Sequence, residues 1–256
     1  MERPAIGVFA LLTLATAAFC QISEADAPAM MAQLAKKNQA WNQKLNGPGL
    51  SLSLVEVARD SHRIRYELHT AGFPPNRKYT IVQWPANRLQ PQDGMKGVTL
   101  DATGRAICAG TPGMCSGRSP NSPIQLQFSP FKTEPIRIAL VSDDDQHLRA
   151  VVNFVPISNR VTDKGCSLES VMLAPNSSLV ALQGSGFKPA AKLTLLSESE
   201  GERHDGPLNA DADGNLYFAM GQGVKGKEQG TTKLTVSSSE CSLSLTLRWG
   251  KDSYEY

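Results

Sequence analysis

Residues 71–81, AGFPPNRKYTI, are similar in sequence to residues 185–195, SGFKPAAKLTL, and these two stretches decide the fold. Each stretch is followed by an Asp-Ala-X-Gly tetrad, whose aspartate lies 29 residues after Gly72 in the first copy and 25 residues after Gly186 in the second. A repeat of this length indicates one supersecondary unit that is used twice. The sequence therefore predicts two similar domains in tandem.

The sequence around both copies alternates between apolar and polar residues. The clearest apolar series are Ile64, Tyr66 and Leu68; Ile136, Ile138 and Leu140; and Cys241, Leu243, Leu245, Leu247 and Trp249. Alternation with a period of two predicts half-buried strands. Strands separated by turns, in units of about 100 residues, favour Greek-key sandwiches of the immunoglobulin-like kind. The expected fold class is all-β, with two tandem immunoglobulin-like antiparallel β-sandwiches.

The chain divides into four expected segments. Residues 1–20 are predicted to be a signal peptide, and residues 21–48 a helical leader. Residues 49–158 form the first predicted β-sandwich domain, and residues 159–256 form the second. Residues 155–164 fall between the two copies and include a proline, so we expect a linker there.

The signal peptide is predicted from an early arginine, an apolar run over residues 5–19 and small residues before a cleavage point. Cleavage after Cys20 and cleavage after Ala17 both fit, and a lipid anchor on Cys20 is the competing interpretation. Export to the periplasm, the cell surface or the medium is the expected localisation. No later apolar run is long enough to cross a bilayer.

The leader carries apolar residues at helical spacing, namely Met30, Leu34, Trp41 and Leu45. A Gly-Pro-Gly sequence at residues 47–49 is expected to end this helix. Three roles remain open for it: packing on the first domain, spacing that domain from the membrane, and binding a partner.

The charge of the chain is close to balanced, with a formal net charge of +2 and basic and acidic residues interspersed. A nucleic-acid-binding surface would require a strong positive field, so nucleic acid is not an expected partner. The expected partner is a protein or glycan at the cell surface whose identity the sequence does not give.

Four cysteines remain if Cys20 leaves with the signal peptide: Cys108, Cys115, Cys166 and Cys241. An even number in an exported chain indicates disulfides, and three connectivities are possible. The repeat favours local pairing, because Cys108 and Cys115 flank a turn in the first copy while the other two lie at opposite ends of the second. We therefore expect the pairs Cys108–Cys115 and Cys166–Cys241.

The Gly-Phe-X-Pro element that enters a strand, followed by Asp-X-X-Gly between strands, resembles the transcription-factor-type immunoglobulin (IPT/TIG-like) modules of bacterial exported proteins. The resemblance covers both copies, about residues 50–256. It implies spacer, adhesive or accessory domains of surface proteins. The segment with Cys108 and Cys115 has no counterpart in the second copy.

The only cofactor that the pattern suggests is calcium. Asn209, Asp211 and Asp213 place oxygen ligands at alternate positions before Gly214, as a calcium loop does. The twelfth position of that loop would be Met220, so the usual glutamate is missing. An ordinary turn capped by the aspartate explains the same residues.

A candidate binding residue is Trp84, which follows a predicted strand in a segment rich in proline and glutamine. An aromatic ring on such a loop can stack on a sugar ring, and it can equally cover the edge of a domain.

We conclude from the sequence that the protein is a non-catalytic exported binding or spacer module. No catalytic motif stands out, and the four histidines occur singly. Two alternatives remain: a carbohydrate- or calcium-dependent adhesion module, and an enzyme with its site in residues 85–123, where the first copy is longer than the second.

Overall fold

The computed structural model describes residues 41, 45–85, 90–108, 121–144 and 146–253. Within these ranges the protein is built from antiparallel strands, as the sequence predicts, with the short 3-10 turns η2 (Pro175–Ser177) and η3 (Lys251–Ser253). The expected signal peptide and most of the expected helical leader lie outside the described residues. No helix in the described part of the chain is long and apolar enough to cross a membrane.

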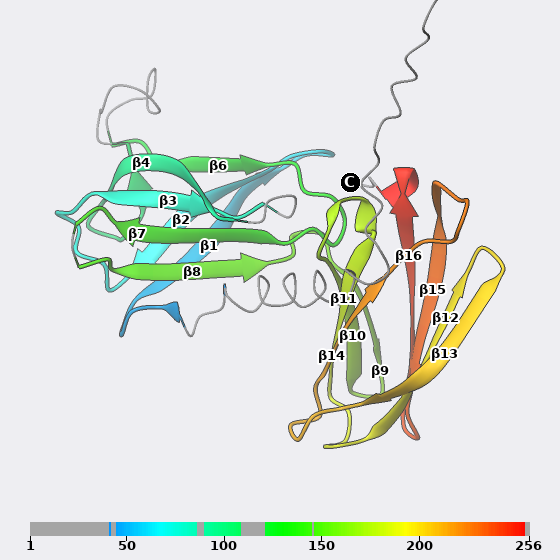
Figure 1. Cartoon of the computed structure of the whole chain (residues 1–256). Coiled ribbons are helices and arrows are strands. Elements are labelled where there is room, and N and C mark those ends of the chain that lie inside the picture. The colour runs from blue at the N-terminus through cyan, green and yellow to red at the C-terminus, as the bar shows by residue number, and fades with distance from the viewer. Residues whose placement is uncertain (1–40, 42–44, 86–89, 109–120, 145, 254–256) are drawn as a thin grey trace, which may run out of the picture.

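The strands that precede residue 155 form two sheets (Figure 1). They are β1 (Ser51–Arg59), β2 (Ile64–Ala71), β3 (Tyr79–Gln83), β4 (Gln92–Leu100), β5 (Ala106–Ile107), β6 (Gln125–Phe128), β7 (Ile136–Ser142) and β8 (Arg149–Phe154). One sheet has the order β1-β2-β6, and the other has the order β5-β4-β3-β7-β8. We refer to β1–β8 as the first strand group.

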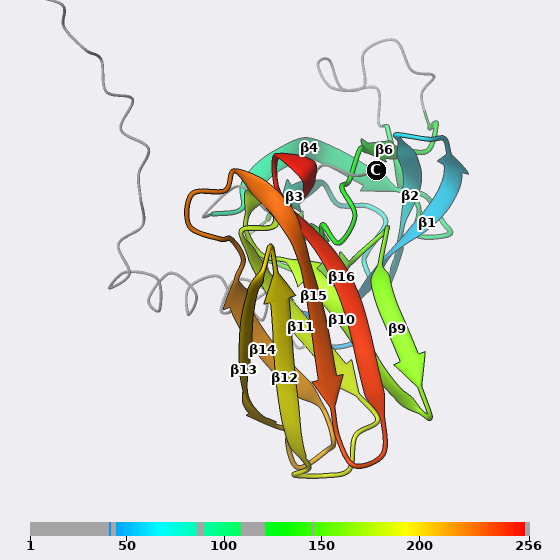
Figure 2. The same ribbon diagram turned by 90° about the vertical axis from the view of Figure 1, so that its right-hand side faces the viewer.

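The strands that follow form two further sheets, which Figure 2 shows face to face. They are β9 (Asn159–Asp163), β10 (Cys166–Met172), β11 (Leu179–Ser185), β12 (Lys192–Ser199), β13 (Glu202–Asn209), β14 (Leu216–Gly221), β15 (Gln229–Ser237) and β16 (Ser242–Gly250). The sheet orders are β14-β11-β10-β9 and β13-β12-β15-β16. We refer to β9–β16 as the second strand group.

The strand order of the first group recurs in the second. Gly72 follows β2 and Gly186 follows β11, so these two strands correspond. With that alignment, β1-β2-β6 matches β10-β11-β14, and β4-β3-β7-β8 matches β13-β12-β15-β16. Within the described ranges, strands β5 and β9 have no counterpart in the other group. The short sequence repeat is thus accompanied by the same pairing of whole strands.

Each strand group encloses its own apolar core, because alternate side chains of a strand point to the same face. The first core draws its buried residues from residues 52–150, and the second from residues 166–247. The residues of the predicted inward series are buried in both groups; Ile64, for example, is 2% exposed, and Trp249 is 3% exposed. The alternation in the sequence therefore identified the core faces correctly.

The segment expected as a linker, residues 155–164, contains strand β9. Strand β9 pairs with β10, from Asp163 opposite Cys166 to Asn159 opposite Ser170. Lys164 and Gly165 form the two-residue turn, both with positive φ, as tight hairpins require. Little in the sequence indicates this strand, because Val161 is its one apolar residue.

Backbone hydrogen bonds join the two strand groups at the loop between β6 and β7. Thr133 donates its N–H to the carbonyl of Ile157 at 2.8 Å, and its own carbonyl accepts from the N–H of Met172 at 2.8 Å. Thr133 is buried and has a φ of 70°. This residue therefore fastens the first group to the segment that begins the second.

Candidate functional site

The repeated Gly-Phe turns have the same geometry in both strand groups. Gly72 has a φ of 79° and Gly186 a φ of 80°, which is the left-handed region. A Cβ atom on Gly72 would lie 2.3 Å from the carbonyl oxygen of Gly49, and one on Gly186 would lie 2.2 Å from that of Gly165. Both glycines therefore allow a close backbone approach that a side chain would block.

The Asp-Ala-X-Gly tetrads form capped turns. In the second group, Oδ1 of Asp211 accepts hydrogen bonds from the N–H groups of Asp213 at 2.9 Å and Asn215 at 2.7 Å. The bond from Asn215 is the main cause that lowers the pKa of the Asp211 carboxyl. The carboxylate therefore stays charged at neutral pH and stabilises the turn.

The first group repeats this turn. Oδ1 of Asp101 accepts from the N–H groups of Thr103 at 2.8 Å and Arg105 at 3.0 Å. Burial acts to raise the pKa of Asp101, but the hydrogen bonds from Thr103 and Arg105 outweigh it and hold the pKa well below its usual range. Because both turns use their aspartate in the same way, this use belongs to the fold.

The predicted calcium ligands Asn209, Asp211 and Asp213 lie at this second turn. Asn209 is the last residue of β13, and all three are exposed. Oδ1 of Asp211 already accepts two N–H groups, so its lone pairs are engaged by the backbone. Among the described residues, no group of three histidine, cysteine, aspartate or glutamate side chains is placed to hold a metal ion.

Trp84 follows β3 directly and is half-buried. Its ring packs edge-to-face on Trp41, with centroids 5.6 Å apart and planes at 68°. Ala139 and Val151, on the outer face of β7 and β8, belong to the same apolar cluster. Trp84 therefore covers part of a sheet face.

A cavity of about 250 Å³ lies beside Trp84, with Gln127, Phe128, Glu134 and Arg137 among its lining residues. Burial lowers the pKa of the Arg137 guanidinium to about 10, while the nearby Glu134 acts in the opposite direction. Burial also raises the pKa of Glu134. A polar wall and an aromatic ring thus face the same space, as they do in many binding sites for small polar ligands.

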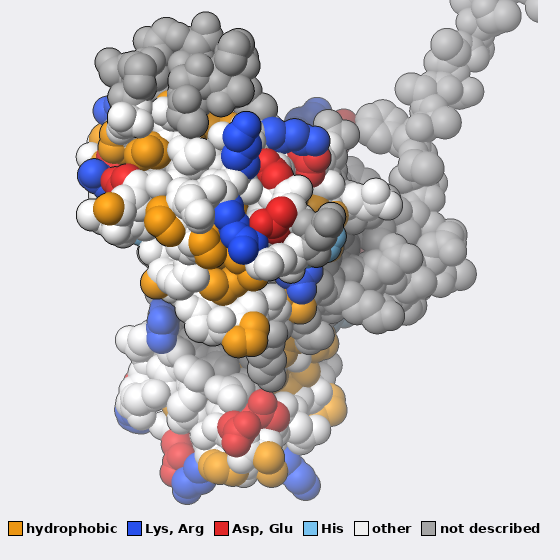
Figure 3. Space-filling model, turned by 90° about the vertical axis from the view of Figure 1, so that its left-hand side faces the viewer, with side chains coloured by type: hydrophobic (Ala, Val, Ile, Leu, Met, Phe, Trp, Pro, Cys, Tyr) orange, Lys and Arg blue, Asp and Glu red, His pale blue; other side chains and the backbone are white. Residues whose placement is uncertain are grey.

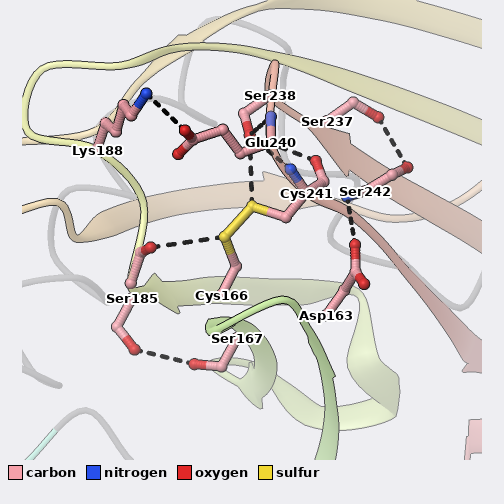
Figure 4. Close-up of a disulfide and its surroundings, with 11 residues drawn as sticks. Asp163, Cys166, Ser167, Ser185, Lys188, Ser237, Ser238, Glu240, Cys241 and Ser242 are labelled. Atoms are coloured by element: carbon pink, nitrogen blue, oxygen red, sulfur yellow. Dashed lines mark hydrogen bonds and ion pairs between the residues drawn. A yellow bond between two sulfur atoms is a disulfide. The ribbon is translucent and has the colours of Figure 1, made fainter.

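The predicted disulfide between Cys166 and Cys241 is confirmed (Figure 4). The two Cα atoms are 6.4 Å apart, and both residues are 3% exposed. The bond joins β10 to the residue before β16 and so links the two sheets of the second group. Cys108 is buried, but Cys115 lies outside the described residues, so their pairing remains a prediction.

The segment 85–123, where the sequence places an alternative enzyme site, is described in part. Its strand β4 leads to β5, where Ile107 pairs with Thr99 and Ala106 with Leu100. Ile124 then donates its N–H to the carbonyl of Ala106 at 2.8 Å. The described part is therefore held to the first core by strand pairing, while residues 86–89 and 109–120 lie outside the description.

A second cavity, which the sequence reasoning missed, has a volume of about 390 Å³ and lies between β12, β13 and β14. Leu195, Phe218 and Met220 give it apolar walls, and Ser197 and Thr232 give it polar ones. The missed signal is that Ser197 and Thr232 continue the inward series of apolar residues in β12 and β15 as buried polar side chains.

The surface shows no field of one sign on the face seen in Figure 3, where basic and acidic side chains lie interspersed. This agrees with the small net charge of the chain. In comparisons with known proteins, no family model matches the chain and no curated protein matches it.

Proposed function

We propose that this protein is a non-catalytic exported module, made of two tandem immunoglobulin-like sandwiches, that binds a partner or sets a spacing at the bacterial cell surface or in the periplasm. The repeated strand order around two separate cores supports the two-sandwich interpretation. The resemblance of the Gly-Phe-X-Pro and Asp-X-X-Gly elements to IPT/TIG-like modules supports the same role.

The observation that carries this proposal is the identical use of Asp101 and Asp211. A general base needs a carboxylate that is free to take a proton near neutral pH. Both aspartates instead cap backbone N–H groups, and both have lowered pKa values. The residues that look most chemical in the sequence thus maintain the fold in both groups.

The proposal is tested by assaying the purified mature chain against chromogenic esters, glycosides, phosphates and peptides. We expect no turnover above that of the heat-denatured protein. Fractionation of expressing bacteria should place the processed chain outside the cytoplasm. Reproducible turnover, or an unprocessed chain in the cytoplasm, would overturn the proposal.

The second candidate function is adhesion to a carbohydrate, favoured by the position of Trp84 beside the 250 Å³ cavity. A glycan array probed with the full chain and with Trp84→Phe and Gln127→Ala variants would test it. Binding that is lost in Gln127→Ala and kept in Trp84→Phe would support a site in that cavity. An array without signal would remove this candidate.

Calcium-dependent adhesion is tested by calorimetric titration of the full chain with calcium chloride. Binding at the Asn209–Asp213 loop should give a saturable heat of binding, of either sign, and a rise in melting temperature, and both effects should disappear in Asp213→Asn. A heat of binding that persists in Asp213→Asn would place the ion elsewhere. No heat would end the calcium hypothesis.

A further inference from the structure

Among the residues that the structure describes, the second strand group is closed along one side and open along the other. On the closed side, the N–H of Ser242 at the start of β16 donates to Oδ2 of Asp163 in β9 at 3.1 Å, and the side chain of Asn159 donates to the carbonyl of Thr246 at 3.0 Å. On the other side, β13 and β14 are the edge strands of their sheets, as Figure 2 shows. The 390 Å³ cavity lies between these two edges.

The first strand group fills the corresponding side with a strand of its own. Strand β5 follows the Asp101 turn and pairs with the edge of β4, the strand that corresponds to β13. Ile107 of β5 also forms a bridge with Pro123, close to the start of β6. In the second group the chain passes from Gly214 through Asn215 directly into β14. The cavity is therefore the place where a closing strand is missing.

The edge of β14 is suited to receive such a strand. The N–H of Gln222 donates to the carbonyl of Ser178, the residue just before β11. By antiparallel alternation, the backbone groups of Ala219 and Gly221 therefore point away from β11. The sequence of β14, LYFAMG, contains no lysine or proline of the kind that blocks pairing at an edge.

The edge of β13 is protected in comparison. Its sequence, ERHDGPLN, carries four ionisable side chains, and Pro207 lacks an N–H group for pairing. An added strand would therefore pair with β14 and not with β13.

Gln222 is one of the residues that line the cavity. The side-chain oxygen and nitrogen of Gln222 are both buried and have no hydrogen-bond partner in the described part of the chain. An amide needs one acceptor and one donor, which a peptide backbone offers together. The walls from Leu195, Phe218 and Met220 would accept the apolar side chains that alternate along a strand.

The charges at the mouth of the cavity indicate which end residues such a peptide should carry. The ionisable residues that line the cavity are Glu202, His204 and Asp205, all on β13. Two of these three side chains are acidic, and the residues that line the cavity include no lysine or arginine. A lysine or arginine in the peptide, beside its apolar residues, would complement this rim. The opposite charges would favour binding mainly through attraction at long range.

We propose that the open side of the second strand group binds an extended segment of a partner protein, which adds as a strand to β14 and places alternate apolar side chains in the cavity. This inference rests on the proposed function as a binding module and names the class of partner. Strand β5 shows that the corresponding side of the first group has room for a strand, although β5 pairs with β4, the counterpart of β13, and reaches the β6 side only at the Ile107–Pro123 bridge. The choice of β14 as the receiving edge in the second group rests on the sequences of β13 and β14.

The test begins with a display library of octapeptides that alternate apolar and polar residues and end in lysine or arginine, selected on the full mature chain. The best peptide is then titrated calorimetrically against the protein. Ser197→Leu, which fills the cavity from β12, should weaken binding at least tenfold without lowering the unfolding midpoint. Thr194→Leu, on the exposed face of the same strand, is the matched control and should leave binding unchanged.

Backbone pairing is tested without any protein variant. Two versions of the selected peptide carry N-methyl groups on alternate residues. One version is methylated at the odd-numbered residues, and the other is methylated at the even-numbered residues. One version should lose binding, because its methyl groups face β14, and the other should keep it. Equal binding of both versions would contradict strand addition.

Three further outcomes would also overturn the proposal. A selection that yields no peptide sensitive to Ser197→Leu would show that the cavity is not used. A concentration-dependent dimer that Ser197→Leu disrupts would assign the edge to a second copy of the chain. Peptide binding that appears only after deletion of residues 21–40 would assign the edge to the protein's own leader. None of these results depends on export or turnover, so the broader module proposal would stand or fall separately.

Discussion

At the scale of single residues, the same contact occurs twice between distant glycines. Gly72 meets the carbonyl of Gly49, and Gly186 meets that of Gly165. Gly49 lies just before β1, and Gly165 lies just before β10. A side chain on Gly72 or Gly186 would therefore collide with the start of the strand that follows its partner glycine. The glycine of each Gly-Phe pair therefore lies where two backbone segments come close together. The phenylalanines, Phe73 and Phe187, are buried in the core beside it.

The first prediction concerns Gly186→Ala. The new methyl group would lie 2.2 Å from the carbonyl oxygen of Gly165, at a positive φ, so we expect a loss of at least about 2 kcal/mol in the free energy of unfolding. Urea denaturation measures this loss. Gly206→Ala is the control, because a Cβ there has no neighbour within 4 Å and should change stability little. Equal effects of the two substitutions would contradict the close-approach argument.

The second prediction concerns the pH dependence that Asp211 contributes. Its pKa is lowered in the folded state, so its stabilisation is present above the unfolded pKa of about 3.9 and is lost as pH falls through the folded pKa. Asp211→Ala should be less stable than the natural chain at pH 7, and the difference should vanish in strong acid. Unfolding midpoints between pH 2 and pH 7, taken at roughly unit steps, measure it.

Asp211→Asn is the matched control for this experiment, because it keeps an acceptor oxygen and removes the charge. Its midpoint should lie between those of the natural chain and of Asp211→Ala at pH 7. A stability difference for Asp211→Ala that is constant across the whole pH range would show that the carboxylate charge plays no part in the turn.

At the scale of elements, the two groups differ by one added strand each. Strand β5 closes the side of the first group, whereas β9 extends a sheet of the second. The addition of β9 leaves β10 in the interior of its sheet, where it carries Cys166. The disulfide to Cys241 thus anchors an interior strand to the opposite sheet, beside the Asp163–Ser242 hydrogen bond (Figure 4).

The third prediction concerns this disulfide. It closes a loop with a sequence separation of 75 residues, and its removal should lower the free energy of unfolding by about 3 to 4 kcal/mol. The double variant Cys166→Ala, Cys241→Ala, compared with the natural chain by guanidinium denaturation, measures the loss. A double variant as stable as the natural chain would contradict the constraint on the unfolded state. The natural chain under reducing conditions serves as a comparison without substitutions.

At the scale of the whole molecule, the two cores share no buried residue, yet the groups are in contact. Thr133 bonds to both Ile157 and Met172. Val155 packs with Leu173 and Leu179 on the outer face of a sheet of the second group. Such a contact should restrict the relative motion of the groups more than a flexible linker would.

The fourth prediction follows from the separate cores. Residues 49–158 and 159–256, produced as two fragments, should each unfold in one cooperative transition, because each keeps a complete apolar core. Each fragment should be less stable than the same group in the full chain, since the Thr133 and Val155 contacts are lost. Circular dichroism during urea titration measures both effects. A fragment without a cooperative transition would show that the two groups fold as one unit.

The sequence alone determined the all-β class, the inward faces of the strands and the Cys166–Cys241 pair. Alternation with a period of two is a local property, so it can be read without knowing which strands are neighbours. The capped turn at Asp211 was also readable as one of two alternatives, because a turn depends on residues that are close in sequence. The need for Gly186 was not, because it arises from the contact with Gly165.

The tertiary structure alone decided the features that depend on neighbours far apart in the chain. Strand β9 has one apolar residue and exists because β10 offers it hydrogen bonds. The packing of Trp84 on Trp41 joins residues more than forty positions apart. The open side between β13 and β14 exists because both are edge strands among the described residues. Which strand becomes an edge depends on distant neighbours, and this leaves almost no trace in the local sequence.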